Sequence, residues 1–325
     1  MKALVLHGAE DLRIEDRPVG HPGEGEVLLH VARGGICGSD LHYMAHGGIG
    51  EAIRLKEPMI LGHEGSAHVA AVGPGVSGLD GGDLVAVSPS RPCQDCAFCR
   101  AGLQNHCTNM RFYGSAMPFP HIQGAFREIL VANAEQCVPA SGLTPDQAAM
   151  AEPLAVCLHA MRQAGNLMGK TVLITGCGPI GCLSILAARR AGAGQIIASD
   201  LTQFTLTMAR HSGADAAINI LETPDGLAPL QAGKGQVDVV FECSGAEPAI
   251  RSAVAALKPR GTLVQLGMGG DATLPLQTIT AKELSLKGSF RFHEEFAEAV
   301  RAMQSGQINV TPLITAVHPF EDAKL

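Results

Sequence analysis

Four closely spaced cysteines carry the strongest chemical signal in this sequence. They follow the pattern Cys93-x2-Cys96-x2-Cys99-x7-Cys107. Four thiolates are the tetrahedral ligand set of a closed structural zinc site, and such a metal holds together a loop that has little core of its own. An iron–sulfur cluster is the competing use, but ferredoxin-type runs end in a three-residue gap followed by proline. Because the last gap here is seven residues and Thr108 follows, we predict structural zinc.

A glycine-rich segment has the G-x-G-x-x-G pattern of a dinucleotide-binding loop. It contains Gly176, Gly178 and Gly181, with Pro179 and Ile180 between the last two glycines. Such glycines permit a tight turn, let a pyrophosphate approach the backbone and let the following helix pack on the preceding strand. The free N–H groups at the start of that helix would face the phosphates. Glycine is abundant here, at 39 of 325 residues, so a turn without a ligand is the alternative.

The acidic residue Asp200 favours the nucleotide reading. It lies 24 residues after Gly176, at the end of the next strand-like run. A carboxylate in this position accepts hydrogen bonds from the adenosine ribose hydroxyls. The next residues, Leu201 to Gln203, offer no Arg or Lys to neutralise a 2′-phosphate. The sequence therefore predicts NAD in preference to NADP.

Four further candidate metal ligands are dispersed along the chain. They are Cys37, His63, Glu64 and Glu152. Together they offer one thiolate, one imidazole and two carboxylates, a set suited to a catalytic zinc that keeps one position open. Their spacing does not show that they meet, and a lone histidine in an apolar context is more often a core residue. Only a resemblance to a known family groups them.

The elements that must position these residues fall into two regions. The first 150 residues contain short β-like runs separated by Gly and Pro turns, at residues 3–6, 26–31, 68–72, 84–87 and 128–131, which predicts an irregular, mostly β domain. Thr144 and Pro145 are typical of a helix start, and a helical stretch over 146–165 follows. From Lys170 onward strands and helices alternate, which predicts an α/β domain with a doubly wound parallel sheet.

Composition excludes several classes of function. The length of 325 residues is typical of about two domains of roughly 150 residues each. The net charge of −7 argues against nucleic acid and acidic membranes as partners. No apolar run is long enough to cross a membrane, and the N-terminal run is too short for a signal peptide. We therefore expect a cytoplasmic protein, in which closely spaced cysteines bind metal rather than form disulfides.

Five motifs in order resemble the zinc-containing medium-chain alcohol and polyol dehydrogenases. They are GICGSDLHY at 35–43, GHE at 62–64, the four-cysteine loop, AEPL at 151–154 and the glycine loop. Glu152 stands where alcohol dehydrogenases have cysteine, which places the resemblance in the sorbitol dehydrogenase branch. Within that branch, residues 33–43, 110–117, 119–121, 267–270 and 288–292 are most similar to the bacterial L-idonate 5-dehydrogenases.

This resemblance implies a domain order. A GroES-like, mostly β catalytic domain would comprise residues 1–152, an inserted Rossmann NAD-binding domain 153–288, and a return to the catalytic domain 289–325. The family continues through a last helix and strand beyond the position of Leu325, so we expect the catalytic domain to be truncated there. The resemblance also implies a homo-oligomer, a dimer or a tetramer.

The resemblance assigns roles to single residues as well. It implies two zinc ions per chain, a structural one on the four cysteines and a catalytic one on Cys37, His63, Glu64 and Glu152. Asp40 would orient His63, Ser39 and His42 would relay the proton, and Tyr43 and Arg291 would contact the substrate.

The implied reaction is hydride transfer between NAD and a small sugar acid, L-idonate, to give 5-keto-D-gluconate. Neutral polyols such as sorbitol or xylitol are the alternative substrates, because polyol enzymes share Arg291. A non-catalytic nucleotide-binding protein is the alternative from another class. The residues Cys37, His63 and Glu64 argue against that alternative.

Overall fold

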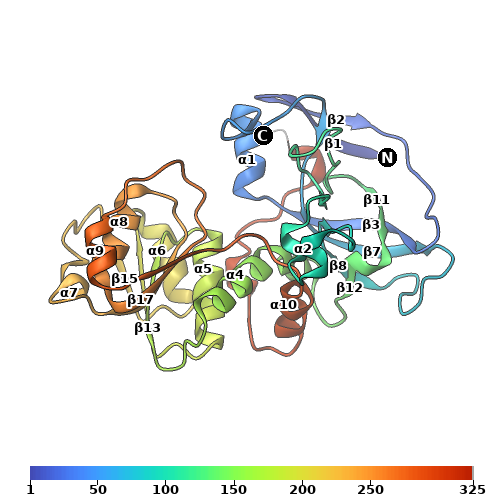
Figure 1. Cartoon of the computed structure of the whole chain (residues 1–325). Coiled ribbons are helices and arrows are strands. Elements are labelled where there is room, and N and C mark those ends of the chain that lie inside the picture. The colour runs from blue at the N-terminus through green and yellow to red at the C-terminus, as the bar shows by residue number, and fades with distance from the viewer. Residues whose placement is uncertain (324–325) are drawn as a thin grey trace. The chain divides into compact units, whose positions relative to one another are not determined.

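The computed structural model describes residues 1–323, and the chain divides into two compact units (Figure 1). The first unit comprises Met1–Glu152, Phe296–Ser305 and the segment from Ala316, and the second comprises Pro153–Glu295 and Gly306–Thr315. The predicted return at residue 289 therefore differs from the observed one at Phe296. Residues 285–288 form a strand of the second unit, and the chain after them stays with that unit until Glu295. Lys324 and Leu325 lie outside the described residues.

The first unit is built mainly from antiparallel strands. They are β1 (Lys2–Gly8), β2 (Asp11–Asp16), β3 (Glu26–Gly35), β4 (Gly48–Ile49), β5 (Ile53–Arg54), β6 (Met59–Ile60), β7 (Glu64–Val72), β8 (Leu84–Val87), β9 (Ser90–Arg91), β10 (Arg111–Phe112), β11 (Ile129–Asn133) and β12 (Cys137–Pro139). A five-stranded sheet has the order β11-β3-β7-β8-β12, and a three-stranded sheet has the order β2-β1-β6. This arrangement confirms the mostly β character that the short strand-like runs predict.

Alternation of buried and exposed residues fixes the faces of the larger sheet. Val27 and Leu29 of β3, Val69 of β7 and Val85 of β8 are buried in one cluster with Leu130 of β11. Side chains two residues apart lie on the same face of a strand, so this pattern sets which faces of β3 and β7 are buried. The pairing of the two strands shifts between Leu28 and Leu29 and again between Val31 and Arg33. Beyond the second shift Gly35 lies opposite Glu64.

Short helices complete this unit. They are α1 (Gly38–His46), α2 (Ala97–Arg100) and α3 (Pro145–Ala149), with α10 (Glu295–Gln304) returning late in the chain and with the 3₁₀ turns Gln104–His106, Ala134–Gln136 and Phe320–Asp322. The Thr144 hydroxyl accepts a hydrogen bond from the backbone of Gln147 at 3.2 Å, which caps α3 as the sequence predicts. The helical stretch predicted over 146–165 is divided into α3 and α4 (Ala151–Ala164).

The second unit contains a six-stranded sheet in which every pair of neighbours is parallel. Its strands are β13 (Thr171–Thr175), β14 (Gln195–Asp200), β15 (Ala216–Asn219), β16 (Val237–Glu242), β17 (Leu257–Gln265) and β18 (Ser285–Gly288). The order β15-β14-β13-β16-β17-β18 reverses direction at β13. The fold is therefore the doubly wound α/β fold predicted from the sequence, in which ligands bind beyond the carboxyl ends of the strands at the reversal.

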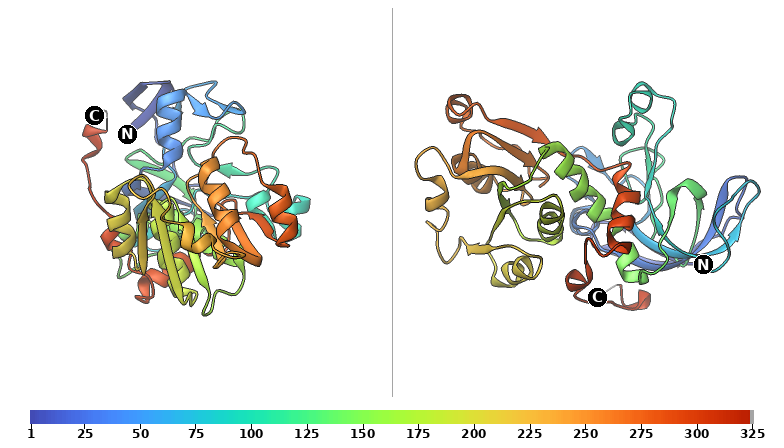
Figure 2. Two further views of the ribbon diagram at one scale, coloured as in Figure 1. Left: turned by 90° about the vertical axis from the view of Figure 1, so that its left-hand side faces the viewer. Right: turned by 90° about the horizontal axis from the view of Figure 1, so that it is seen from below.

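Helices connect these strands and cover the sheet. They are α5 (Pro179–Arg190), α6 (Gln203–His211), α7 (Ala228–Gln231), α8 (Glu247–Ala256) and α9 (Leu276–Ala281), with a 3₁₀ turn at Thr311–Leu313. Helix α6 packs on β14 and β15, and α8 packs on β16 and β17 (Figure 2). Central strands such as Val172–Ile174 are completely buried, as expected for strands covered on both faces. No helix within residues 1–323 is long and apolar enough to cross a membrane.

We expect Glu295 to make the second unit less stable in acid. Its carboxylate lies 3.0 Å from both His159 Nδ1 and Arg162 Nη1 and accepts a hydrogen bond from the backbone of His293. Burial alone would raise its pKa, but these hydrogen bonds lower the pKa of Glu295 to about 2. Glu295→Gln should therefore cost about 1–3 kcal/mol at pH 7.

The pH dependence of that cost provides the check. The folded-state pKa of Glu295 lies below its ordinary value of 4.5, so the stabilisation is complete above that value and is lost as the pH falls toward 2. Urea unfolding of wild type and Glu295→Gln at pH 7 and at low pH should give a difference that shrinks in acid. A difference that is constant with pH would contradict the assignment.

Candidate functional site

The four-cysteine loop brings its thiols together around α2. The sulfur atoms of Cys93, Cys96, Cys99 and Cys107 all lie within 4.8 Å of one another. Tetrahedral zinc with Zn–S bonds of about 2.3 Å requires sulfur atoms about 3.8 Å apart, so this cluster has the dimensions of a zinc site. All ten cysteines of the chain are free thiols.

Backbone N–H groups point toward the sulfur atoms of this cluster. Cys107 Sγ accepts from the backbone of Cys93 at 3.2 Å and from that of Asn109 at 3.3 Å. Cys96 precedes α2 as its N-cap, and backbone hydrogen bonds from Cys99 and Thr108 lower the pKa of Cys96 to about 5. Burial and the neighbouring thiols of Cys96 and Cys107 instead raise the pKa of Cys99 to about 12. Zinc binds thiolates, so a bound cation would supply the charge that four thiolates in this loop require.

A second cluster forms in the first unit from three of the four dispersed residues. Donor atoms of Cys37, His63 and Glu64 lie within 4.8 Å of one another. Cys37 is the N-cap of α1, and Glu64 begins β7 directly after His63. The antiparallel pairing of β3 and β7 places Gly35 opposite Glu64, which brings the chain just before α1 to the start of β7. A Cβ atom on Gly35 would lie 2.2 Å from Glu64 Oε2, so only glycine leaves room for this carboxylate.

The electrostatics of this cluster favour a bound cation. Burial, and then the nearby Glu64 carboxylate, raise the pKa of Cys37 to about 12. Burial, and then the Asp40 carboxylate, raise the pKa of Glu64 to about 8. A thiolate and carboxylates are therefore costly together in this buried place unless a positive charge is added. The sulfur, nitrogen and oxygen donors fit zinc, which would supply that charge.

Glu152 lies close enough to Cys37 to add to the negative electrostatic potential at its thiol. It is buried in the first turn of α4, and its charge also raises the pKa of Cys37. Its carboxylate is not among the three donor atoms that meet within 4.8 Å. The described geometry therefore brings together three of the four proposed ligands and leaves Glu152 beside them.

The carboxylate of Asp40 supports the cluster of Cys37, His63 and Glu64 through hydrogen bonds to the backbone. Its Oδ2 accepts a hydrogen bond from the backbone of Cys37 at 3.0 Å, and its Oδ1 accepts one from Gly62 at 3.2 Å. Oδ1 also lies 3.8 Å from Nδ1 of His63. One buried carboxylate thus fixes the chain before both Cys37 and His63.

Helix α1 carries the predicted relay residues. Ser39 is half-buried and His42 is exposed on this helix. Tyr43, predicted to contact substrate, is only 2% exposed and packs against Leu6 and Met59 in a small core cluster. Its hydroxyl accepts a hydrogen bond from the backbone of Ala116 at 3.0 Å. The role of Tyr43 toward substrate stays a prediction.

Arg291 belongs to the second unit. Its guanidinium lies 4.9 Å from the centre of the Phe290 ring, and its φ of 55° is left-handed. Its role toward substrate also stays a prediction.

The glycine loop of the second unit adopts the geometry that each glycine was expected to permit. Gly176, directly after β13, has a φ of 82°, and a Cβ atom there would lie 2.8 Å from the backbone of Ser244. Gly178 is the N-cap of α5 and Pro179 is its first residue. A Cβ atom on Gly181 would lie 1.9 Å from the carbonyl oxygen of Gly176. The loop therefore leads tightly from strand to helix, with the helix N–H groups at its rim.

Asp200 lies beside this loop at the end of β14. Its Oδ2 accepts a hydrogen bond from the backbone of Cys177 at 2.6 Å, and Oδ1 accepts from Leu201 at 2.6 Å and Thr202 at 3.2 Å. A carboxylate has about four acceptor positions, so these bonds orient Asp200 and leave capacity for a ribose hydroxyl.

Sequence reasoning missed two residues that shape these sites. Phe112 of β10 lies with its ring centre 5.7 Å from that of His63, and no spacing rule indicates that contact. Glu242, completely buried at the end of β16, accepts hydrogen bonds from Ser244 and Gly245 at 2.9 Å each. It also accepts from the Ser244 hydroxyl. A buried acid followed by Cys-Ser-Gly at a strand end is the signal that could have indicated it.

Each unit contains a region that matches a known protein family. The alcohol dehydrogenase GroES-like domain family matches residues 23–142, and the zinc-binding dehydrogenase family matches residues 179–305. The chain is 41% identical to an L-idonate 5-dehydrogenase (NAD(P)(+)) of Escherichia coli over 99% of its own length and 92% of that protein. It is 38% identical to the sorbitol dehydrogenase of Bos taurus, over 99% of the chain and 90% of that enzyme.

Solved structures agree with these relatives. The crystal structure of L-idonate 5-dehydrogenase from Escherichia coli superimposes with a TM-score of 0.95 over 99% of this chain and 92% of that one, at 41% identity. A zinc-binding dehydrogenase from Sinorhizobium meliloti bound to NADP, 29% identical, gives a TM-score of 0.86 over 95% of this chain and 90% of that one. Full-length identity above 40%, with the same two-part fold, shows that the chain belongs to the zinc-binding dehydrogenases, a family of NAD(P)-dependent oxidoreductases.

Proposed function

We propose that this chain oxidises L-idonate at C5 to 5-keto-D-gluconate, with NAD⁺ as the hydride acceptor. The observation that carries this proposal is the 41% identity to the Escherichia coli L-idonate 5-dehydrogenase along nearly the whole of both chains. That identity exceeds the 38% shared with bovine sorbitol dehydrogenase, which favours a sugar acid over a neutral polyol.

We propose two zinc ions per chain. Cys93, Cys96, Cys99 and Cys107 would hold the structural ion, because the cluster is closed by four thiols and has no donor to spare for substrate. Cys37, His63 and Glu64 would hold the catalytic ion. Glu152, which lies near Cys37, would bind the ion either directly or through a water molecule. Zinc held by these residues would supply a positive charge that lowers the pKa of a substrate hydroxyl, as it lowers that of bound water.

The residues around the catalytic cluster then position substrate and move the proton. Asp40 fixes the backbone before Cys37 and His63, so the donors are held in place before substrate arrives. Ser39 and His42, both on α1 directly after Cys37, would carry the hydroxyl proton toward solvent, since His42 is exposed. Bound NAD⁺ would supply the hydride-acceptor chemistry.

A substrate panel tests the proposed reaction. Initial rates with L-idonate, D-gluconate, sorbitol and xylitol, each with NAD⁺ and NADP⁺, should give the highest kcat/KM for L-idonate with NAD⁺. We expect at least about a tenfold margin over sorbitol, equivalent to the loss of one charged contact. A higher kcat/KM with sorbitol would favour the neutral-polyol function, which the 38% identity to sorbitol dehydrogenase supports as the second candidate. Turnover with none of the four would contradict both.

The preference for NAD⁺ should depend on Asp200. Asp200→Ala should raise KM for NAD⁺ by about 10- to 100-fold, because a carboxylate hydrogen bond to ribose contributes about 1.5–3 kcal/mol. KM for NADP⁺ should fall or change little, since the removed charge repels the 2′-phosphate. Asp225→Ala, in an exposed part of the same unit, is the control. Equal effects on both cofactors would mean that Asp200 only supports the loop through its bonds to Cys177 and Leu201.

We also propose that the protein is a cytoplasmic homo-oligomer, a dimer or a tetramer. Ten free cysteines and two thiol-containing metal sites support a reducing compartment. Light scattering of the purified protein would give the number of chains.

A further inference from the structure

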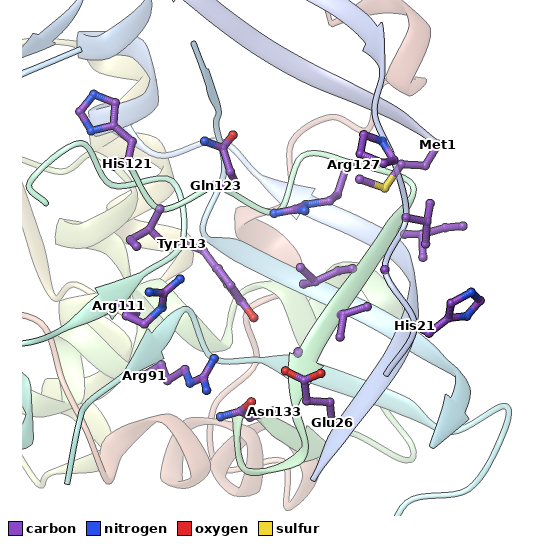
Figure 3. Close-up of a pocket in the computed structure, with 18 residues that line it drawn as sticks. Met1, His21, Glu26, Arg91, Arg111, Tyr113, His121, Gln123, Arg127 and Asn133 are labelled. Atoms are coloured by element: carbon purple, nitrogen blue, oxygen red, sulfur yellow. The ribbon is translucent and has the colours of Figure 1, made fainter. Parts of the chain in front are cut away.

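A cavity of about 440 Å³ lies in the first unit, and none of the candidate metal ligands lines it. Its wall is formed largely by β11, by residues around β10, and by the segment that leads into β3 (Figure 3). The polar side chains that matter here are those of Arg91, Arg111, Arg127, Tyr113, Gln123 and Asn133. The cavity is therefore a site separate from the catalytic cluster.

The wall of this cavity carries an excess of positive charge. Three arginines line it, Arg91, Arg111 and Arg127, against one carboxylate, that of Glu26. None of the three guanidinium groups forms an ion pair with a carboxylate of residues 1–323. Glu26 instead accepts a hydrogen bond from the backbone of Gly23 at 3.0 Å. Three unpaired guanidinium groups around one hollow are unusual in a chain whose net charge is −7.

Arg127 is the most deeply placed of the three. Its Nε donates to the carbonyl oxygen of Gly124 at 2.7 Å. This hydrogen bond fixes the side chain and leaves the two terminal nitrogens available to bind a ligand. Burial lowers the pKa of Arg127, although guanidinium still keeps its charge at neutral pH. A half-buried cation without an anionic partner is costly, and an anion in the cavity would remove that cost.

The neutral polar groups of the wall also leave donors for a ligand. Gln123 Oε1 already accepts a hydrogen bond from the backbone of Ile60 at 2.9 Å, and the Asn133 side chain accepts one from the backbone of Gln136. The oxygen atom of each amide therefore already accepts a hydrogen bond, and each NH₂ group remains available to donate to a ligand. The Tyr113 hydroxyl lies 3.3 Å from Gln136 Oε1, to which it donates.

We propose that this cavity binds a small molecule through a phosphate or carboxylate group, held by Arg91, Arg111 and Arg127. Guanidinium forks bind such oxyanions with two parallel hydrogen bonds, and the amide donors complete the oxygen shell. The volume of about 440 Å³ admits a metabolite of sugar-phosphate size rather than a bare ion.

The short strand β10 and Tyr113, which follows it, serve both this cavity and the catalytic cluster. Successive side chains of a strand point to opposite faces. Arg111 and Tyr113 line the cavity, while Phe112 between them contacts the ring of His63. A ligand in the cavity would therefore not touch the metal ligands. The residues on either side of Phe112 would line its site, and Phe112 itself contacts the ring of His63.

Calorimetric titration at constant ionic strength tests this proposal. Inorganic phosphate and succinate are the probes, with NAD⁺ present so that the dinucleotide loop is occupied. Wild type should bind at least one probe saturably, and the double variant Arg91→Gln/Arg111→Gln should bind it at least about tenfold more weakly, as expected for lost charge-assisted hydrogen bonds. Binding of phosphate alone or succinate alone would identify the headgroup.

A charge-matched control keeps the test specific. Arg13→Gln/Arg54→Gln removes two exposed arginines of the same unit, which pair with Asp11 and Glu51, and should leave affinity unchanged. The single variant Arg111→Lys keeps the charge but loses the fork, so it should weaken binding partially. The proposal is overturned by no saturable binding of either probe to wild type, by full affinity in Arg91→Gln/Arg111→Gln, or by equal weakening in the control. Because binding is measured rather than turnover, failure here is distinguishable from failure of the proposed reaction.

Discussion

Replacing Cys37 by alanine is expected to abolish NAD⁺-dependent oxidation and to remove one of the two zinc ions proposed for each chain. Cys37 supplies the only sulfur in the cluster with His63 and Glu64. Without it, the remaining nitrogen and oxygen donors would hold zinc weakly and the substrate alkoxide would lose its counter-charge, a contribution of several kcal/mol. We expect kcat/KM to fall at least about a thousandfold. Metal analysis and initial rates measured on the same preparation provide the check.

The matched control is Cys137→Ala. Cys137 is also a buried thiol of the first unit, but it packs in the core of the larger sheet and belongs to neither metal cluster. It should retain both zinc ions and near wild-type turnover. If Cys37→Ala kept its turnover, or lost both zinc ions together, the assignment of Cys37 to the catalytic site would be wrong.

Replacing Cys96 by alanine should instead destabilise the protein while leaving its chemistry intact. The loop around α2 buries few side chains, and its four thiols are its main common contact. Zinc binding of this kind contributes to folding directly. We expect a loss of at least about 3 kcal/mol, equivalent to roughly 6 to 12 °C in Tm, together with one zinc ion. At temperatures where the variant is folded, kcat should stay within about threefold of wild type.

The control for this change lies in the same loop. Leu103→Ala removes a side chain that is 47% exposed and keeps all four thiols, so Tm and zinc content should be unchanged. Scanning calorimetry and metal analysis distinguish the outcomes. A Cys96→Ala variant with wild-type Tm would show that the four thiols do not hold a structural ion, and a loss of turnover at low temperature would show that the two clusters are not independent.

The features of this protein that can be predicted from sequence are those built from residues close together in the chain. The parallel sheet is indicated by the alternation of strand-like and helical runs after Lys170, where the structure has strands such as β14 and β16. The four-cysteine cluster lies within fifteen residues, from Cys93 to Cys107, so short loops alone can close it. The glycine loop likewise joins one strand to the next helix. In each case the chemistry is completed by residues near in sequence, and spacing therefore carries the information.

Helix α1 and the position of Tyr43 show where sequence reasoning ends. No apolar periodicity marks Gly38–His46 as a helix, since only Asp40 and Tyr43 are buried within it. The helix depends on its capping by Asp40, which bonds to the backbone of Cys37. Tyr43 is placed in a core cluster by contacts with Met59 and Leu61, residues that its own neighbourhood in the sequence does not reveal.

The sequence by itself determined the types of ligand, the cofactor loop and the doubly wound sheet. Only the tertiary structure decided that Cys37 meets His63 and Glu64, that Phe112 packs on His63, and that three arginines surround one cavity. The physical reason is register: the pairing of Gly35 with Glu64 across β3 and β7 depends on the buried core that holds the sheet together and on two shifts of register between Leu28 and Arg33. A contact of that kind depends on the whole sheet, and no spacing between two residues encodes it.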